Sequence, residues 1–298
     1  MELFKNKEEN TILKRIEKKE YNNKSYLNNY NKLIIFFLIL NIILINYILF
    51  SKNYYKNKKF NVNFDYHKYQ REFVTNKIIK YSGMALFNEQ YYFINGLIRK
   101  YKPKKCLEIG VYKGGSAILI LNAIKDIKNS HLVSLDLNEF LYNDPSKKTG
   151  YRVKEYFPEL IDKWSLFTGR QPHIFLEKLN MKFDFVFLDS AHYTPGEFFN
   201  LIEILPFLNN NPIIVLHDII NWHFFYFNRP QRIIPTQIYL ISALFGDKVI
   251  IKKNKELDDI GAVFLYKNQE EHYIDYFLLL FSFWEKMPDE TQITLNLK

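Results

Sequence analysis

From about residue 85 onward, short apolar segments alternate with segments of helical periodicity, and this alternation limits the folds open to the chain. Short apolar runs between helical segments are typical of buried strands. Because consecutive parallel strands need a crossover, usually a helix, the pattern predicts a parallel sheet covered on both faces. The predicted strands are 105–110, 131–136, 164–168, 183–189 and 212–217, with helices near 88–101, 115–128, 151–161, 171–180, 195–208 and 231–245.

Two more predicted strands, 248–253 and 260–266, close this body. Only the polar turn 254–259 joins them, which is too short for a parallel crossover and therefore requires an antiparallel pair. The predicted fold class is α/β: a Rossmann-like, doubly wound, mostly parallel sheet of seven strands whose last strand is antiparallel.

An apolar run, LIIFFLILNIILINYILF at residues 33–50, precedes the body and carries no charge. At ~1.5 Å per residue, a helix of this length spans ~27 Å, about the thickness of the hydrocarbon layer. The run begins too late for a cleavable signal peptide, and no small-residue cleavage site follows it. The sequence therefore predicts one transmembrane helix; the alternative is a buried core helix.

The net charge of +9 comes from the N-terminal part of the chain, since residues 1–82 hold 16 Lys/Arg and 7 Asp/Glu. A basic excess beside an apolar run fits anionic lipid headgroups, and no nucleic-acid-binding motif accompanies it. The charges flanking the run are too even to decide its orientation. We predict a basic tail at 1–32, the transmembrane helix at 33–50, a basic connector at 51–82 and the main domain at 83–298.

The stretch EIGVYKGGS follows the first predicted strand of the body and predicts a ligand-binding loop. Ligands of open parallel sheets bind at the carboxyl ends of the strands. Gly110 allows a sharp turn and close approach to a ligand, and Ser116 could cap the next helix. Neither the dinucleotide fingerprint G-x-G-x-x-G nor the phosphate loop G-x-x-x-x-G-K-[ST] is present.

Two acids indicate which ligand this loop would bind. Glu108 would repel a pyrophosphate and favour a cation, such as a sulfonium with a free amino group. Asp136 ends the second strand and is placed to accept hydrogen bonds from ribose hydroxyls. We therefore expect a nucleoside without phosphates; the alternative is a glycine-rich turn without a ligand.

A second group of polar residues follows the fourth and fifth strands. Asp189 and Asp218 end these strands, and their carboxylates could hold a hard divalent cation. Such a cation would lower the pKa of a substrate hydroxyl. His217, Asn221 or water could complete the ligands. His192 titrates near neutrality and suits a general base, although it could instead brace its loop by hydrogen bonding.

The motifs LEIGVYKGGSA, SLD, FLDSAH and IIVLHD occur in this order within residues 85–267. Together they resemble the class I S-adenosylmethionine-dependent O-methyltransferases, above all the sugar and macrolide O-methyltransferase-like group and the catechol-type enzymes. The resemblance implies S-adenosylmethionine as cofactor. It implies cofactor contacts from Glu108, Gly110, Tyr112 and Ser116 at the methionine part, Asp136 at the ribose, the turn with Gly169 and Arg170 near the adenine, and Asp189.

The same resemblance implies that Asp189 and Asp218 are ligands of Mg²⁺ or another divalent cation. It places His192 where catechol-type enzymes carry the residue that deprotonates the acceptor, with Asp189 beside it among the catalytic residues. The chain departs from the catechol-type pattern at Ile219, where those enzymes have an amide ligand.

The resulting hypothesis is a membrane-anchored O-methyltransferase that acts on a hydroxyl of a sugar or lipid-linked saccharide. Its domain would lie on the cytosolic side, where S-adenosylmethionine is made. The alternatives are a catalytically silent Rossmann-like binding module and a nucleotide-dependent oxidoreductase. The pair Glu108 and Asp136 argues against the first, and Glu108 with the missing fingerprint argues against the second. The oligomeric state is not predicted.

Overall fold

The structure is a computed structural model that describes residues 65–69, 71–83, 88–190, 196–219, 244–253 and 256–276. The chain divides into two units at residues 59 and 60, and every described residue belongs to the second unit. No helix among the described residues is long and apolar enough to cross a membrane. The predicted transmembrane segment 33–50, most of the predicted helix 231–245 and His192 lie outside the described residues.

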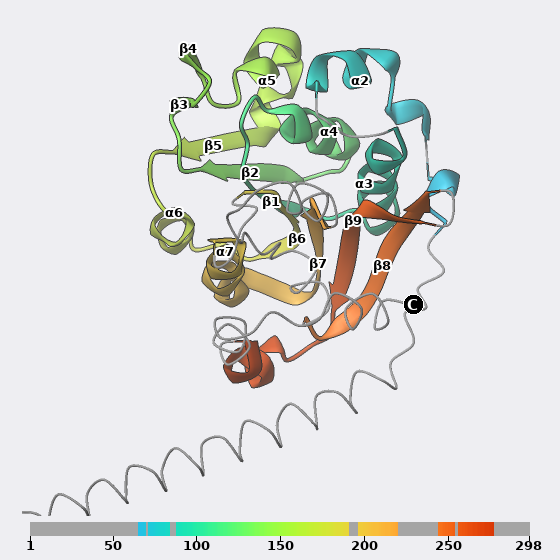
Figure 1. Cartoon of the computed structure of the whole chain (residues 1–298), viewed down its shortest axis with the longest axis vertical. Helices are drawn as coiled ribbons and strands as arrows, with labels where there is room; N and C mark the ends of the chain where they lie inside the picture. The colour runs from blue at the N-terminus through green and yellow to red at the C-terminus, as the bar shows by residue number, and fades with distance from the viewer. Residues whose placement is uncertain are drawn as a thin grey trace, which may run out of the picture. The chain divides into compact units, whose positions relative to one another are not determined.

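One seven-stranded sheet forms the centre of the second unit, in the order β5-β2-β1-β6-β7-β9-β8 (Figure 1). The pairs β5–β2, β2–β1, β1–β6 and β6–β7 are parallel, whereas β9 is antiparallel to both β7 and β8. The prediction of a mostly parallel sheet with an antiparallel last strand is confirmed. The strands are β1 (Lys105–Ile109), β2 (His131–Asp136), β5 (Trp164–Thr168), β6 (Phe183–Leu188), β7 (Leu208–His217), β8 (Gly246–Lys253) and β9 (Glu256–Leu265).

Helices cover both faces of the sheet and divide its apolar side chains between two cores. Successive residues of a strand point to opposite faces, so Phe185 and Phe187 of β6 join one core, and Val186 and Leu188 the other. The helices are α2 (Asn76–Ser82), α3 (Asn88–Tyr101), α4 (Gly115–Ile124), α5 (Tyr151–Tyr156), α6 (Pro172–Leu179) and α7 (Gly196–Ile204).

The folded body begins earlier than the predicted boundary at residue 83. Within the predicted connector 51–82, Thr75 caps α2 by accepting a hydrogen bond from the backbone N–H of Ile78. Val74 and Ile78 are buried in the core that also contains α3 and α4. The sequence reads as a connector because most other residues of this short segment are exposed and polar.

Two further differences have local causes. The predicted helix 151–161 is split into α5 and the 3₁₀ helix Pro158–Lys163, because Pro158 has no backbone N–H to continue α5. A hairpin of β3 (Phe140–Leu141) and β4 (Asp144–Lys148) was not predicted. All five residues of β4 are exposed, so no alternation of apolar and polar residues announces this strand.

Candidate active site

The carboxyl ends of the parallel strands meet at one edge of the sheet, and Gly110 brings two of the loops there into contact. Gly110 has a φ of 88°, and a Cβ built on it would lie 1.8 Å from the carbonyl oxygen of Asp189. The backbone N–H of Asp189 donates to the carbonyl of Ile109 at 3.0 Å. Only glycine fits this contact, so the predicted cofactor loop and the predicted metal ligand Asp189 are direct neighbours.

Glu108 lies beneath the loop rather than at its surface. Its side chain is fully buried, and its two carboxylate oxygens accept hydrogen bonds from the hydroxyls of Ser116 and Ser134. The indole N–H of Trp164 in turn donates to the Ser134 hydroxyl at 2.8 Å. Burial raises the pKa of Glu108 to about 7, although the two serine hydroxyls oppose the shift. Glu108 thus ties β1 to α4 and β2, and its contact with a cofactor stays a prediction.

The sequence suggested that Ser116 could cap α4, but the structure shows that it does not. The residue at the cap is Gly114, in the left-handed conformation and without a side-chain hydrogen bond. The Ser116 hydroxyl donates to Glu108 instead, because a buried carboxylate is a stronger acceptor than the alternatives within reach.

Asp136 organises the same loop from the end of β2. One carboxylate oxygen accepts the backbone N–H groups of Val111 and Tyr112 at 2.8 and 3.0 Å, and the other accepts that of Asn138 at 2.8 Å. Tyr112 has a φ of 48°, which these two hydrogen bonds help to hold. A carboxylate offers about four acceptor positions. Three are used here, so one remains for a ligand hydroxyl, and ribose binding by Asp136 stays a prediction.

Gly169 and Arg170 lie exposed just beyond the end of β5. Gly169 has a φ of 85° and donates its N–H to the carbonyl of Asp136 at 3.1 Å. A Cβ on Gly169 would lie 2.6 Å from a carboxylate oxygen of Glu139. The residue predicted at the ribose, Asp136, and the residue predicted near the adenine, Gly169, are therefore hydrogen-bonded to each other. Glu139 lies beside Gly169 and was not predicted from the sequence.

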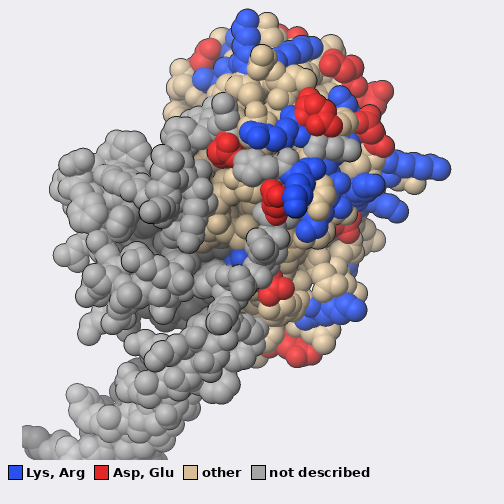
Figure 2. All heavy atoms as spheres, turned by 90° about the vertical axis from the view of Figure 1, so that its right-hand side faces the viewer, with Lys and Arg blue, Asp and Glu red and all other residues tan. Residues whose placement is uncertain are grey.

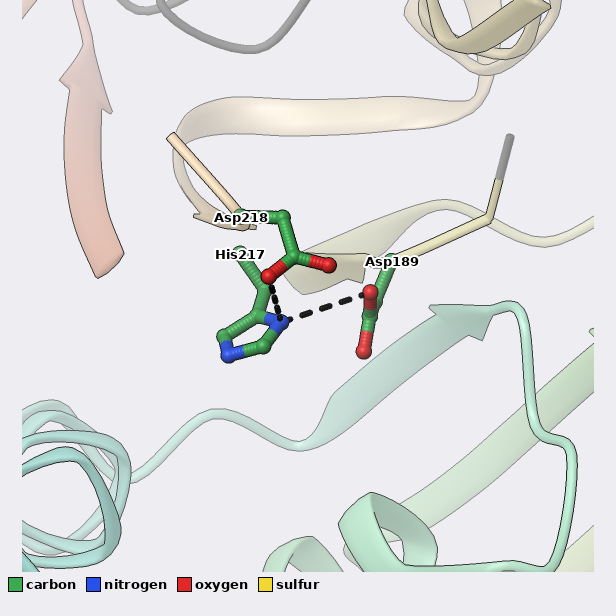
Figure 3. Close-up of side chains that lie close together, drawn as sticks. All are labelled: Asp189, His217 and Asp218. Carbon is green, nitrogen blue, oxygen red and sulfur yellow. Dashed lines mark ion pairs between the residues drawn. The ribbon is translucent and has the colours of Figure 1, made fainter. Parts of the chain in front are cut away.

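At the ends of β6 and β7, three side chains form the one group among the described residues that could hold a metal ion (Figure 3). Nδ1 of His217 lies 3.4 Å from a carboxylate oxygen of Asp189 and 3.5 Å from one of Asp218. Their ligand atoms all lie within 4.8 Å of one another. Asp218 has a φ of 53°, in the left-handed region that favours glycine. Residues other than glycine that adopt this conformation are frequent at functional sites.

The chemistry of this group fits a divalent cation. Burial lowers the pKa of His217, but the carboxylates of Asp189 and Asp218 outweigh burial and leave it well above its ordinary value. A proton on His217 thus offsets part of the charge of the two carboxylates, and a cation bound by all three side chains would replace that proton. Two carboxylates with one imidazole suit Mn²⁺ better than Mg²⁺, which prefers oxygen alone. The sequence offered His217 and Asn221 as further ligands of a cation held by Asp189 and Asp218. His217 lies beside the two carboxylates, and Asn221 is outside the described residues.

A buried glutamate beside this group was also missed from the sequence. Glu197, in the first turn of α7, is fully buried, and its pKa is raised well above the ordinary value by burial, with further contributions from Asp189 and Asp218. Glu197, Leu201 and Ile204 are all buried, and their spacing places them on one face of the helix. An acid at an apolar position of a helical repeat is the signal that could have identified it.

Residues 107–219 match the family model described as a methyltransferase domain. No curated protein matches the sequence.

Several solved structures are similar to this chain. The O-methyltransferase TomG from Streptomyces achromogenes, involved in tomaymycin synthesis and solved with SAM, is 16% identical, with 64% of this chain and 90% of TomG covered and a TM-score of 0.48. An O-methyltransferase from Bacillus cereus, solved with SAH, is 17% identical, with 63% and 89% covered and a TM-score of 0.46. An SAH-bound Podospora anserina methyltransferase is 17% identical, with 65% and 89% covered and a TM-score of 0.46.

The family match runs from the middle of β1 to just beyond the end of β7, the part of the chain that supplies Glu108, Asp136, Asp189 and Asp218. This part of the chain is therefore similar to the methyltransferase domain family.

Proposed function

We propose that this domain transfers a methyl group to a hydroxyl oxygen of its acceptor. The observation that carries the proposal is the group of Asp189, His217 and Asp218, because it lies against the loop at Gly110. A methyl donor bound at that loop and a hydroxyl held at that group would be close neighbours. Proximity and orientation of this kind supply much of the catalysis in a group transfer.

Each residue has a proposed role. Asp136 holds the loop through Val111 and Tyr112 and offers its remaining acceptor position to the ribose. Asp189, His217 and Asp218 would hold a divalent cation, which would lower the pKa of the acceptor hydroxyl. The acceptor oxygen would attack the methyl carbon while its proton passed to His192. Breaking of the carbon–sulfur bond would leave a methyl ether and the demethylated cofactor.

The proposed acceptor is a sugar or a lipid-linked saccharide. Beside the predicted cofactor loop, Tyr112 stacks on Tyr142 with ring centroids 5.5 Å apart, and Leu137 and Phe140 are exposed nearby in the chain. Exposed apolar side chains gathered at one place are typical of binding surfaces. A pyranose ring has an apolar face that packs on such rings, which supports a saccharide rather than a small charged acceptor.

We propose in addition that residues 33–50 anchor the chain in a membrane with the domain on the cytosolic side. Basic side chains support an anionic membrane as a partner. Lysines are exposed in the loops before β1 and β2, and Figure 2 shows Lys and Arg gathered, among acids, on one face of the domain. Each such charge near an anionic leaflet contributes about 1 kcal/mol.

Two experiments on the full chain in detergent test the methyl transfer. Calorimetry should show binding of S-adenosylmethionine, weakened in Asp136→Ala by about 1–3 kcal/mol through lost hydrogen bonds. Transfer of labelled methyl groups to saccharide acceptors should fall on chelation and return with Mn²⁺, and Asp189→Asn and Asp218→Asn should be nearly inactive. Binding without transfer to any acceptor would favour the silent module, and full activity in excess EDTA would exclude the cation.

The anchor has its own test. Removal of residues 1–50 should release the chain from membranes but leave its affinity for S-adenosylmethionine unchanged, because no predicted site residue lies there. Protease added to intact cells should spare the domain, whereas protease added to inside-out vesicles should digest it. Digestion from the outer face of intact cells would refute the cytosolic placement.

A further inference from the structure

We propose that Glu197 and Asn200 of α7 are positioning residues that hold Ser190, and thereby fix Asp189. We refer to Glu197 and Asn200 as the α7 clamp. The inference rests on the proposed function for its catalytic consequence. Its structural part, the restraint on Ser190, stands independently of that function.

Ser190 donates two hydrogen bonds, and both go to the same helix. Its backbone N–H donates to a carboxylate oxygen of Glu197 at 2.9 Å, and its hydroxyl donates to the side-chain oxygen of Asn200 at 2.7 Å. Residues 197 and 200 are three apart, so their side chains lie on one face of α7. Main chain and side chain of Ser190 are therefore held together by one rigid element.

The clamp continues into a second helix. The side-chain N–H₂ of Asn200 lies 3.5 Å from Glu203, and Glu203 pairs with His173 of α6 at 2.9 Å. A series of polar contacts thus runs from Ser190 through α7 to α6. Asn200 is restrained at both ends of its amide, which fixes the orientation in which its oxygen faces Ser190.

The position of Glu197 argues for a purpose other than packing. It shares the buried face of α7 with Leu201 and Ile204, where an apolar side chain would fit the core. Burying a carboxyl group costs free energy of desolvation that an apolar side chain would avoid. A leucine would therefore serve stability at least as well, and the glutamate is explained by what it holds.

The clamp acts on the residue next to Asp189. The N–H of Asp189 is bound by the carbonyl of Ile109 in β1, and the N–H of Ser190 is bound by Glu197. Two successive peptide groups are thus fixed from opposite sides. The carboxylate of Asp189 faces His217 (Figure 3), and the restraint on the adjoining peptide groups would keep it there. Residues that orient metal ligands in this way typically change metal affinity or activity by about 10- to 100-fold when replaced.

The test compares matched variants of the full chain in detergent. Glu197→Gln keeps an acceptor oxygen of similar shape, whereas Glu197→Leu keeps only the volume; Asn200→Asp and Asn200→Leu form the same contrast for the hydroxyl of Ser190. Glu177→Leu, on the exposed surface of α6, is the control. We measure Mn²⁺ affinity by electron paramagnetic resonance, hydrogen exchange of a peptide spanning Ser190, and methyl transfer.

We expect Glu197→Leu to weaken Mn²⁺ binding at least about tenfold and to speed exchange of the Ser190 amide by a similar factor. Glu197→Gln should stay near wild type in both. The kcat should fall in Glu197→Leu and stay near wild type in Glu197→Gln, because only the first variant loses the acceptor for the Ser190 N–H. Asn200→Leu should show a weaker form of the same defects, and Asn200→Asp a smaller defect than Asn200→Leu, because it keeps the acceptor for Ser190 but sets a carboxylate beside Glu203.

Unchanged exchange at Ser190 in Glu197→Leu would overturn the proposal. A Glu197→Gln variant as defective as Glu197→Leu would also overturn it, because the charge and not the acceptor would then matter. If Glu197→Leu fails to fold, Glu197→Gln and the Asn200 pair decide the question. Altered exchange in a chain whose wild type transfers no methyl group would support the clamp and refute the proposed function.

Discussion

Glu108→Gln should make the ligand-free protein more stable at pH 8 and should change its stability little at pH 4.5. The cause is the burial of Glu108, which raises its pKa from an ordinary value of 4.5 to about 7. Because the folded pKa lies above the unfolded one, the folded protein binds this proton more tightly. The stabilisation linked to the proton is complete below about pH 4.5 and is lost as the pH rises through about 7.

The size of the effect follows from the width of this window. The unfolded pKa of 4.5 and the folded pKa of about 7 differ by about 2.5 units, and each unit corresponds to about 1.4 kcal/mol. Ionised Glu108 should therefore destabilise the folded state by about 3 kcal/mol at pH 8. Glutamine carries no charge and avoids this cost. Its oxygen accepts from one serine hydroxyl, and its N–H₂ group donates to the other, since hydroxyls serve as donors and acceptors.

Urea unfolding at pH 4.5, 6, 7 and 8, extrapolated to zero denaturant, measures the difference between the two proteins. That difference should grow by about 3 kcal/mol in favour of glutamine across the window. Other buried groups titrate in both proteins and cancel in the comparison. Glu177→Gln, which removes an exposed carboxylate, should follow the wild type. If the difference between Glu108→Gln and wild type is constant with pH, Glu108 does not titrate as its burial requires.

Two further predictions concern backbone contact and thiol chemistry. Gly110→Ala should lower the free energy of unfolding by at least about 2 kcal/mol in urea unfolding, because the new Cβ would strike the Asp189 carbonyl oxygen and the residue has a φ of 88°. Gly83→Ala is the control and should lower it less, because its Cβ would meet the movable end of the Arg152 side chain. Cys106 is fully buried and burial raises its pKa, so mass spectrometry should find no alkylation by iodoacetamide at pH 8 until urea unfolds the chain; rapid alkylation of the native protein would contradict the buried position.

The sequence located the strands of the sheet well, because each buried strand is a continuous apolar run between polar turns. The exceptions are segments whose residues face water. β7 starts at Leu208 and not at residue 212, since Asn209 to Asn211 add polar residues to the strand. The hairpin β3–β4 and the short helix α2 gave no apolar pattern long enough to recognise. These segments were not predicted because their side chains are largely exposed and polar and so give no apolar pattern, and not because their backbone is unusual.

The site was only partly predictable. Topology places acids that end parallel strands at one edge, so Asp136, Asp189 and Asp218 could be grouped from sequence. The hydrogen-bond partners of each oxygen depend on how the loops fold against one another. His217 and Asp218 are successive residues, which would face opposite sides of a regular strand. Both approach Asp189 because Asp218 adopts a φ of 53° beyond the end of β7, which no pattern in the sequence reveals.

The acids of this site also account for the kind of ligand it suits. Glu108 and Glu197 are buried, and the charges of Asp189 add to the rise in the pKa of both. Asp136 and Asp218 lie at the same edge of the sheet. Carboxyl groups gathered in this way repel one another when ionised, and a cation relieves that repulsion. A sulfonium with an ammonium group gains this energy on binding, whereas a pyrophosphate would add to the repulsion. The electrostatics thus favour the methyl donor over the dinucleotides that similar sheets bind. The absence of a glycine-rich phosphate-binding motif from the sequence agrees with this preference.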